Sequence, residues 1–253
     1  MARAFDGGSQ VFSNSAATPV TIVPFTMCCW FLPTDVSGAQ VMLNIGRWGV
    51  QADVFLMYMS GSDLRAQTWR VAGNEASVGT VTAGIWQHGT VVFAAVDDRT
   101  VYLDGASNND TGSTEPTAID SINIGGQRWG GSHINWYEGS MAEVGVWDVA
   151  LSVSEIAALE AGATPPLVRP GSLVFYDPLV RGPVGGTSQD IVGGITMSDT
   201  GSITVDNHPP VTHYPTSPAI ITAPPAAPGG DPEGPLTRGK LIRGGILAGR
   251  LVA

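Results

Sequence analysis

The chain has 253 residues and a formal net charge of −10, with 33 glycines, 18 prolines and only 13% charged residues. This length can bury a large core, and the composition is typical of short strands joined by tight turns, which excludes a helical bundle. Residues 208–253 hold four basic and two acidic side chains, so residues 1–207 carry −12, and such an acidic body excludes nucleic acid and anionic membranes as partners.

Strands are predicted at regular spacing through the first 147 residues, separated by glycine- and aspartate-rich turn signals. They are expected over residues 3–5, 10–12, 26–32, 41–45, 54–59, 64–69, 86–96, 100–103, 121–124, 134–137 and 138–147. The apolar run 91–96 predicts a central strand covered on both faces, and 101–105 is expected to pair with it as a hairpin. Many short antiparallel strands without intervening helices predict an all-β, two-sheet sandwich.

Cys28 and Cys29 are adjacent in the strand predicted over 26–32, so their side chains should point to opposite faces. We therefore expect two free, buried thiols and no disulfide framework. The chain opens without an apolar leader and contains no run of 18 apolar residues. The expectation is synthesis in a reducing cytoplasm, without a signal peptide or a membrane span.

The strand predicted over 138–147 leads into a short, capped helix. Its alternation predicts one face formed by Ala142, Val144 and Val146 and another formed by Met141, Glu143, Gly145 and Trp147. Ser152 and Glu155 have the spacing of a capping box, and Leu151 and Ile156 have that of a hydrophobic staple. Gly162 suits the position just after the helix, where a left-handed residue commonly ends it.

Weaker strands over 173–178, 191–197 and 203–205 are expected to return to the edge of the sandwich. The composition changes near residue 208, because the following residues are rich in proline, glycine, alanine and threonine and cannot form a core. We therefore predict a jelly-roll domain over 1–207, a linker over 208–235 and a C-terminal attachment peptide over 236–253. His208 and His213 lie in the predicted linker and are expected to be solvated.

The attachment peptide alternates apolar residues with glycine and basic residues, and its glycines argue against a stable free helix. We expect it to order against a sister subunit or a larger assembly, by adding a strand to an exposed edge or by charge attraction to a neighbouring acidic body. The alternative is a disordered extension. The contacts are predicted for Arg238, Lys240, Leu241, Ile242, Arg243, Ile246, Leu247, Arg250 and Leu251.

Six short motifs follow one another along the chain: FDG at 5–7, CWF at 29–31, WQH at 86–88, VYLDG at 101–105, INIG at 122–125 and GSMAEVGVW at 139–147. With the capped helix that follows, this succession resembles the laminin-G-like, concanavalin A-like jelly-roll family over roughly residues 2–162. The resemblance implies a concanavalin A-like jelly-roll sandwich, so the expected fold is this sandwich with the one short helix after the motif strands and the extended C-terminal tail predicted above. Such domains occur in lectins, adhesion modules, glycan-degrading enzymes and bacteriophage virion proteins, so the family implies fold more than activity.

Glucanases with this fold carry their catalytic carboxylates two residues apart on one strand, because residues two apart share a face and bring two carboxyl groups to about 5–5.5 Å. The sequence contains no Glu-x-Asp-x-Glu run of this kind and no variant that is one residue longer. Glu138 and Glu143 are five residues apart and are predicted to face opposite sides of a continuous strand. No nucleophile elbow, phosphate-binding loop or His-Glu-x-x-His motif is present either. A non-enzymatic protein is expected.

Tryptophans in or near loops suggest a binding rim, because sugars stack on aromatic faces. The predicted ligand-binding residues are Trp48, Trp69, Arg128, Trp129 and Trp136. These rings suit subunit contacts equally well. By contrast, Trp30, Trp86 and Trp147 match core positions of the family and are expected to pack.

The resemblance also makes calcium a possible ligand, held at the sandwich rim by carboxylates and carbonyls from separate loops. The candidate residues are Asp53, Asp97, Asp98 and Asp104. The alternative is that these aspartates only form turns, since the sequence contains no compact calcium-binding loop. No other cofactor is expected.

The leading hypothesis is a non-enzymatic bacteriophage virion structural protein, since the missing leader, the missing disulfides and the C-terminal peptide are most similar to the virion examples. It would be a decoration or fibre protein on the virion surface, made in the host cytoplasm. We expect a homo-oligomer, a trimer or another cyclic form, anchored through its tail. The alternative is a lectin-like, carbohydrate-binding module that recognises host surface glycans.

Overall fold

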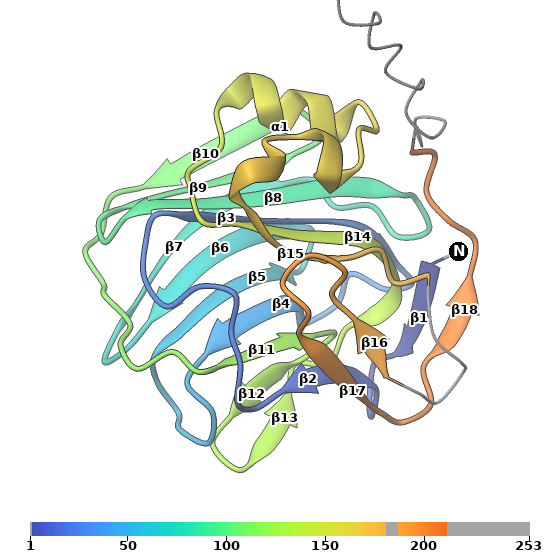
Figure 1. The fold of residues 1–253 in the computed structure, drawn as a ribbon, viewed down its shortest axis with the longest axis horizontal. Coiled ribbons are helices and arrows are strands. Elements are labelled where there is room, and N and C mark those ends of the chain that lie inside the picture. Colours follow the sequence, from blue (N-terminus) through green and yellow to red (C-terminus); the bar gives the residue numbers. More distant parts are fainter. Residues whose placement is uncertain (1, 181–186, 212–253) are drawn as a thin grey trace, which may run out of the picture. The chain divides into compact units, whose positions relative to one another are not determined.

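The structure, a computed structural model, describes residues 2–180 and 187–211, which form two packed antiparallel sheets (Figure 1). The strands are β1 (Ala2–Asp6), β2 (Val11–Asn14), β3 (Phe25–Pro33), β4 (Ala39–Gly46), β5 (Val54–Ser60), β6 (Asp63–Trp69), β7 (Gly73–Gly79), β8 (Gln87–Ala95), β9 (Asp98–Leu103), β10 (Ala106–Asp110), β11 (Ser121–Ile124), β12 (Gln127–Trp129), β13 (Ser132–Ile134), β14 (Glu138–Trp147), β15 (Leu173–Asp177), β16 (Ser188–Gln189), β17 (Thr196–Thr200) and β18 (Thr204–Asp206). The predicted all-β, two-sheet jelly-roll sandwich is confirmed.

The first sheet has the order β10-β9-β8-β3-β14-β1-β18, with β15 also paired to β14. The second has the order β16-β17-β2-β11-β4-β5-β6-β7, and β12 and β13 form a separate hairpin. The facing sides of the two sheets enclose the main core, because alternate residues of each strand are apolar and point inward. Phe25, Phe55 and Phe93 meet at its centre with ring centroids 4.9–5.1 Å apart.

The predicted alternation along β14 is wrong at its start, because a β-bulge lies between Ala142 and Gly145. Two residues there oppose a single residue of β3, which shifts the side-chain period by one. Met141 consequently joins Val144 in the core between the sheets. Ala142 lies instead in a cluster with Trp30 on the outer face of the first sheet.

The predicted capped helix is confirmed as α1 (Val153–Glu160), which lies on the outer face of the first sheet (Figure 1). The Ser152 backbone N–H donates to Glu155 Oε2 at 2.8 Å, and Leu151 and Ile156 pack in one cluster. Gly162 follows with a φ of 97°. Two short 3-10 turns, η1 (Pro165–Leu167) and η2 (Pro170–Ser172), then lead into β15.

Both cysteines are free and buried, as predicted. Cys28 packs beneath α1, whereas Cys29 lies in the core between the sheets, so adjacent residues do point to opposite faces. Burial raises the pKa of both thiols, which keeps them protonated and unreactive at neutral pH.

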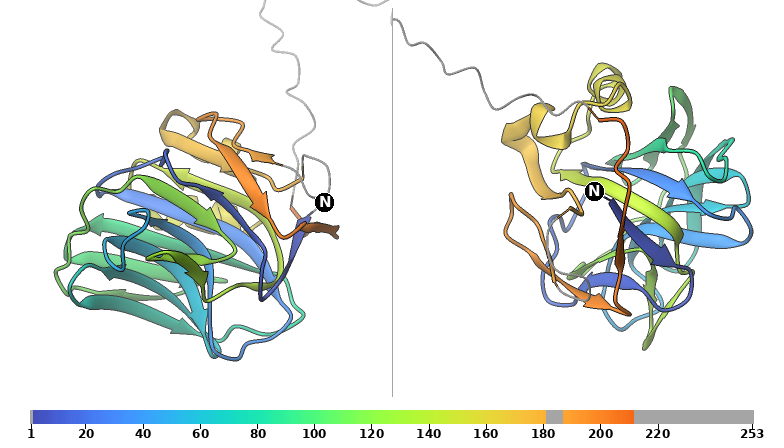
Figure 2. Two further views of the ribbon diagram at one scale, coloured as in Figure 1. Left: turned by 90° about the horizontal axis from the view of Figure 1, so that it is seen from below. Right: turned by 90° about the vertical axis from the view of Figure 1, so that its right-hand side faces the viewer.

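The last described segment returns to the N-terminal strand. β18 pairs with β1, with Ala2 opposite Asp206 (Figure 2). The expectation that His208 is solvated is wrong: its Nε2 lies 3.1 Å from Glu143 Oε1, and its side chain is only 14% exposed. The reason is that the chain continues over the outer face of the first sheet, where Val211 packs against the cluster around Trp30.

The rest of the predicted linker, with His213, and the predicted attachment peptide over 236–253 lie outside the described residues. Among residues 2–180 and 187–211, no helix is long and apolar enough to cross a membrane.

Candidate functional site

The outer face of the second sheet carries a band of side chains set by the pairing of β5 with β6. Residues two apart on β6 point the same way, so Arg65, Gln67 and Trp69 all face outward while Leu64 and Ala66 enter the core. Their partners across the ladder are Tyr58 for Arg65, Leu56 for Gln67 and Val54 for Trp69. This register places aromatic, apolar and amide groups side by side on a rigid surface.

The β12–β13 hairpin carries two of the predicted ligand residues, Arg128 and Trp129. Gln127 pairs with Ile134, Arg128 with His133, and Trp129 with Ser132. Because side chains alternate along each strand, Gln127 and Trp129 share one side of the hairpin and Arg128 occupies the other. The hairpin therefore divides the predicted ligand residues into two groups.

The first group is a pocket of about 210 Å³ between the hairpin and β6, called here the Trp69–Trp129 pocket. Its lining residues are Gln67, Trp69, Gln127, Trp129, Ile134 and Asn135. The two indole rings lie 6.1 Å apart between centroids at 72°, and both are partly exposed. Both rings pack against an apolar cluster that contains Val54 and Leu56.

Three carboxamides supply the polar groups of this pocket. Gln127 Oε1 accepts a hydrogen bond from Asn135 Nδ2 at 2.9 Å, and Gln67 Nε2 donates to Glu75 Oε2 at 3.0 Å. Among the described residues, no partner engages Gln67 Oε1, Gln127 Nε2 or Asn135 Oδ1. The pocket therefore offers two unengaged carbonyl oxygens and one NH2 group with both hydrogens unengaged to a ligand.

The charged groups beside the pocket are paired with one another. The Glu75 carboxylate accepts from Arg65 Nη1 at 2.6 Å and from Tyr58 Oη at 2.5 Å, in addition to Gln67. Arg65 also lies 3.3 Å from Asp63 Oδ2. Burial and the Glu75 charge raise the pKa of Tyr58, so its hydroxyl stays a donor at neutral pH. This network fixes Gln67 beside the pocket.

The second group is a row of rings on the opposite side of the hairpin. The Arg128 guanidinium carbon lies 4.2 Å from the Trp48 ring centroid, within cation–π range. His133 stands between Trp48 and Trp136, with centroid separations of 5.9 and 5.5 Å. Burial, with help from Arg128, lowers the pKa of His133 to about 4, so the imidazole is neutral at neutral pH. His133 was not among the predicted ligand residues, because its place opposite Arg128 is recognisable only once β12 and β13 are paired.

The Laminin_G_3 family, described as the concanavalin A-like lectin/glucanases superfamily, matches residues 5–157. The chain belongs to this family. No curated protein matches the sequence.

Solved structures share the concanavalin A-like fold at low identity. A candidate carbohydrate-binding protein from Bacteroides ovatus superposes with a TM-score of 0.55 and 17% identity, over 80% of this chain and 58% of that one. A NanB sialidase from Streptococcus pneumoniae gives 0.51 and 14%, over 62% of this chain and 27% of that one. The superposed part is therefore less than two thirds of either structure, and the likeness concerns the fold alone.

The calcium candidates of this concanavalin A-like domain do not fit one shared site. Asp53 accepts from the Thr117 backbone N–H at 2.8 Å and lies 3.5 Å from Arg70 Nε, so its charge is already balanced. Asp98, Asp104 and Asp97 lie elsewhere; Asp98 bonds Asn109 Nδ2, and Asp104 accepts from the backbone N–H of His88 and from Gln87 Nε2. Among the described residues, no three metal-binding side chains converge.

The two acids considered for glycoside hydrolysis are not paired in a cleft. Glu143 is only 1% exposed and accepts a hydrogen bond from Tyr176 Oη at 2.7 Å on the side opposite His208. Glu138 lines a separate polar pocket beside Trp136. The bulge at Ala142–Gly145 turns the Glu143 side chain toward Tyr176 and His208. Glu143 is therefore unavailable to a substrate in the pocket that Glu138 lines.

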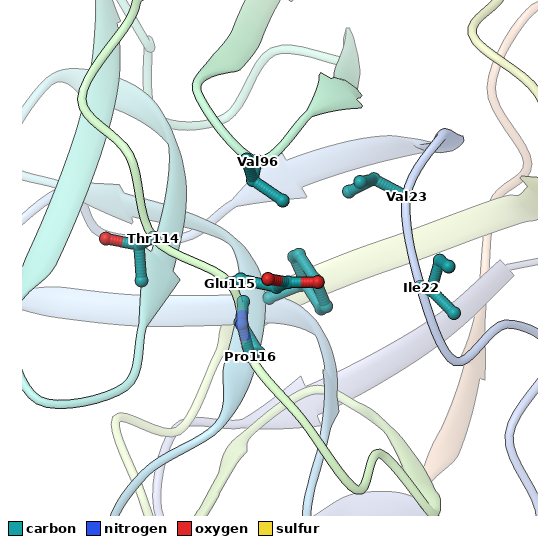
Figure 3. Close-up of a pocket in the computed structure, with 7 residues that line it drawn as sticks. Ile22, Val23, Val96, Thr114, Glu115 and Pro116 are labelled. Carbon is teal, nitrogen blue, oxygen red and sulfur yellow. The ribbon is translucent and has the colours of Figure 1, made fainter.

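A further crevice of the concanavalin A-like domain lies between the loop before β3 and residues 114–116 (Figure 3). Ile22, Val23 and Val96 face Glu115 and Pro116 across it. Its volume is about 10 Å³. This is the size of a single water molecule, so the crevice cannot hold a sugar ring.

Proposed function

We propose that this concanavalin A-like domain binds glycans in the Trp69–Trp129 pocket. The observation that carries the proposal is the meeting of two partly exposed indole rings with three unengaged carboxamide ends in one pocket of about 210 Å³. Sugars present C–H faces that stack on indole and hydroxyl groups that pair with amides. The fold likeness to a candidate carbohydrate-binding protein from Bacteroides ovatus agrees with this proposal.

The pocket is also held rigid, which favours binding because little conformational freedom is lost. Trp69 and Gln67 stand on a strand paired on both sides, and Gln67 is fixed by Glu75. Trp129 is fixed by the β12–β13 hairpin, in which the backbone N–H of Arg128 donates a hydrogen bond to Asn44 Oδ1 at 2.9 Å.

Replacing Trp69 or Trp129 by alanine should weaken glycan binding at least tenfold, about 1.4 kcal/mol, because each ring supplies one stacking surface. A glycan array followed by titration calorimetry on the best-binding glycan measures the loss. Trp86→Ala is the matched control, since Trp86 lies with Trp30 on the first sheet. Retention of binding by both pocket variants, with their fold intact by circular dichroism, would contradict the proposal.

We propose further that the protein acts without catalysis, as a bacteriophage virion structural protein displayed on the virion surface as a decoration or fibre protein. It would form a cyclic homo-oligomer anchored through residues 236–253. The favouring observation is that β18, His208 and Val211 tie the chain to the first sheet up to residue 211, so anything that follows is attached to the sandwich at a fixed point.

Mass spectrometry of purified virions tests this second proposal, and absence of the chain from the virions would contradict it. Deletion of residues 236–253 should abolish incorporation into particles while the thermal unfolding of the sandwich stays unchanged. Normal incorporation of the truncated chain would remove the anchoring role.

A further inference from the structure

We propose that the Trp69–Trp129 pocket selects neutral glycans and discriminates against those that carry sialic or uronic acid. This refinement rests on the proposed glycan-binding function and names the class of sugar. It starts from the lining itself, in which all six residues are uncharged.

Among residues 2–180 and 187–211, no lysine, arginine or histidine lines the pocket. Arg65, the closest on β6, lies 2.6 Å from Glu75 Oε1 and 3.3 Å from Asp63 Oδ2, so its charge is already balanced by two acids. Arg128 lies on the opposite side of the hairpin, over Trp48. Proteins usually bind carboxylates through charge-assisted bonds from such groups, and this pocket supplies none.

The carboxamide atoms of the pocket that have no partner among the described residues also favour hydroxyl groups as ligands. Because the Glu75 carboxylate only accepts, Gln67 must present Nε2 to it, which leaves Oε1 as the unengaged end. Asn135 Oδ1 is a second acceptor, and Gln127 Nε2 is the amide nitrogen with both hydrogens unengaged. A hydroxyl can donate to these two carbonyl oxygens. A carboxylate can only accept, so it would face two other oxygen acceptors without a hydrogen between them.

The test is an array of matched glycan pairs that differ in one acidic sugar, such as lactose and 3′-sialyllactose, with the full chain as the probe. The neutral member of each bound pair should bind at least tenfold more tightly. The preference should persist in about 1 M salt, where the Debye length is ~3 Å and repulsion by the acidic body is screened.

A variant pair separates the pocket from the rest of the protein. Ile134→Lys adds a cation to the lining and should reduce the preference for neutral over acidic glycans severalfold. Ile134→Gln is the neutral match of this variant and should leave that preference unchanged. Equal or tighter binding of the acidic members overturns this inference and leaves glycan binding intact. Binding to no glycan at all overturns the proposed function itself.

Discussion

Replacing Glu143 by alanine should lower the free energy of unfolding by about 3 kcal/mol, because a buried cluster loses its shared acceptor. Glu143 is 1% exposed, and its carboxylate accepts from Tyr176 Oη at 2.7 Å and lies 3.1 Å from His208 Nε2. Without it, a buried hydroxyl loses its acceptor and the imidazole loses its carboxylate contact. Urea denaturation measures the change.

Glu143→Gln is the matched control, since it keeps the side-chain length, an acceptor oxygen and the same backbone position with its φ of 56°. It should lose less than half as much stability as the alanine variant. Limited proteolysis provides a second readout: the alanine variant should be cut sooner near residues 207–211, which His208 holds against the first sheet. A loss below 1 kcal/mol in the alanine variant would contradict the role assigned to Glu143.

Replacing Gly139 by alanine should destabilise the sandwich by about 4 kcal/mol, because the backbone there accepts no side chain. Its φ is 139°, and an added Cβ would lie 2.2 Å from the Leu32 carbonyl oxygen and 2.8 Å from Pro33 Cα. Both atoms belong to the backbone of β3, so the clash cannot be relieved by turning a side chain. A large fall in thermal midpoint, or recovery only as insoluble protein, is expected.

Gly171→Ala is the control for this substitution, since Gly171 is exposed and an added Cβ meets nothing within 4 Å. It should change stability by less than about 0.5 kcal/mol. Equal thermal midpoints for the two variants would contradict the prediction, because they would show that the close approach of β14 to β3 tolerates a side chain at position 139.

Sequence patterns predicted the elements whose signals are local. The alternating or apolar strands, the helix after Ser152 and the opposed cysteines all follow from side-chain period and capping chemistry. β7 and β10 were not predicted, since GNEASVG has only Ala76 and Val78 as apolar residues and ASNND has only Ala106. They are strands because β6 and β9 offer free edges, and Asn108 Nδ2 links them by donating to the Ser77 carbonyl at 2.9 Å.

The candidate site was predicted in its residue types but not in its grouping. Whether Trp129 meets Trp69 or Trp48 depends on the register of a three-residue hairpin, which no propensity determines. The carboxamides of Gln67, Gln127 and Asn135 carry no motif and are recognisable only once the strands are paired. The bulge in β14 was missed for the same reason, since the extra residue is visible only against β3.

The pairing of Ala2 with Asp206 has a mechanical consequence. Both ends of this ladder leave from the same side, so tension applied between residues 2 and 211 would break its hydrogen bonds one at a time, as in unzipping, rather than all together in shear. Residues 207–211 would peel away first, followed by β18 and then β1. The load would then reach β17 and β2 of the second sheet, from which β11, β4 and β5 separate β6 with Trp69, so the pocket keeps its shape while the attachment corner yields.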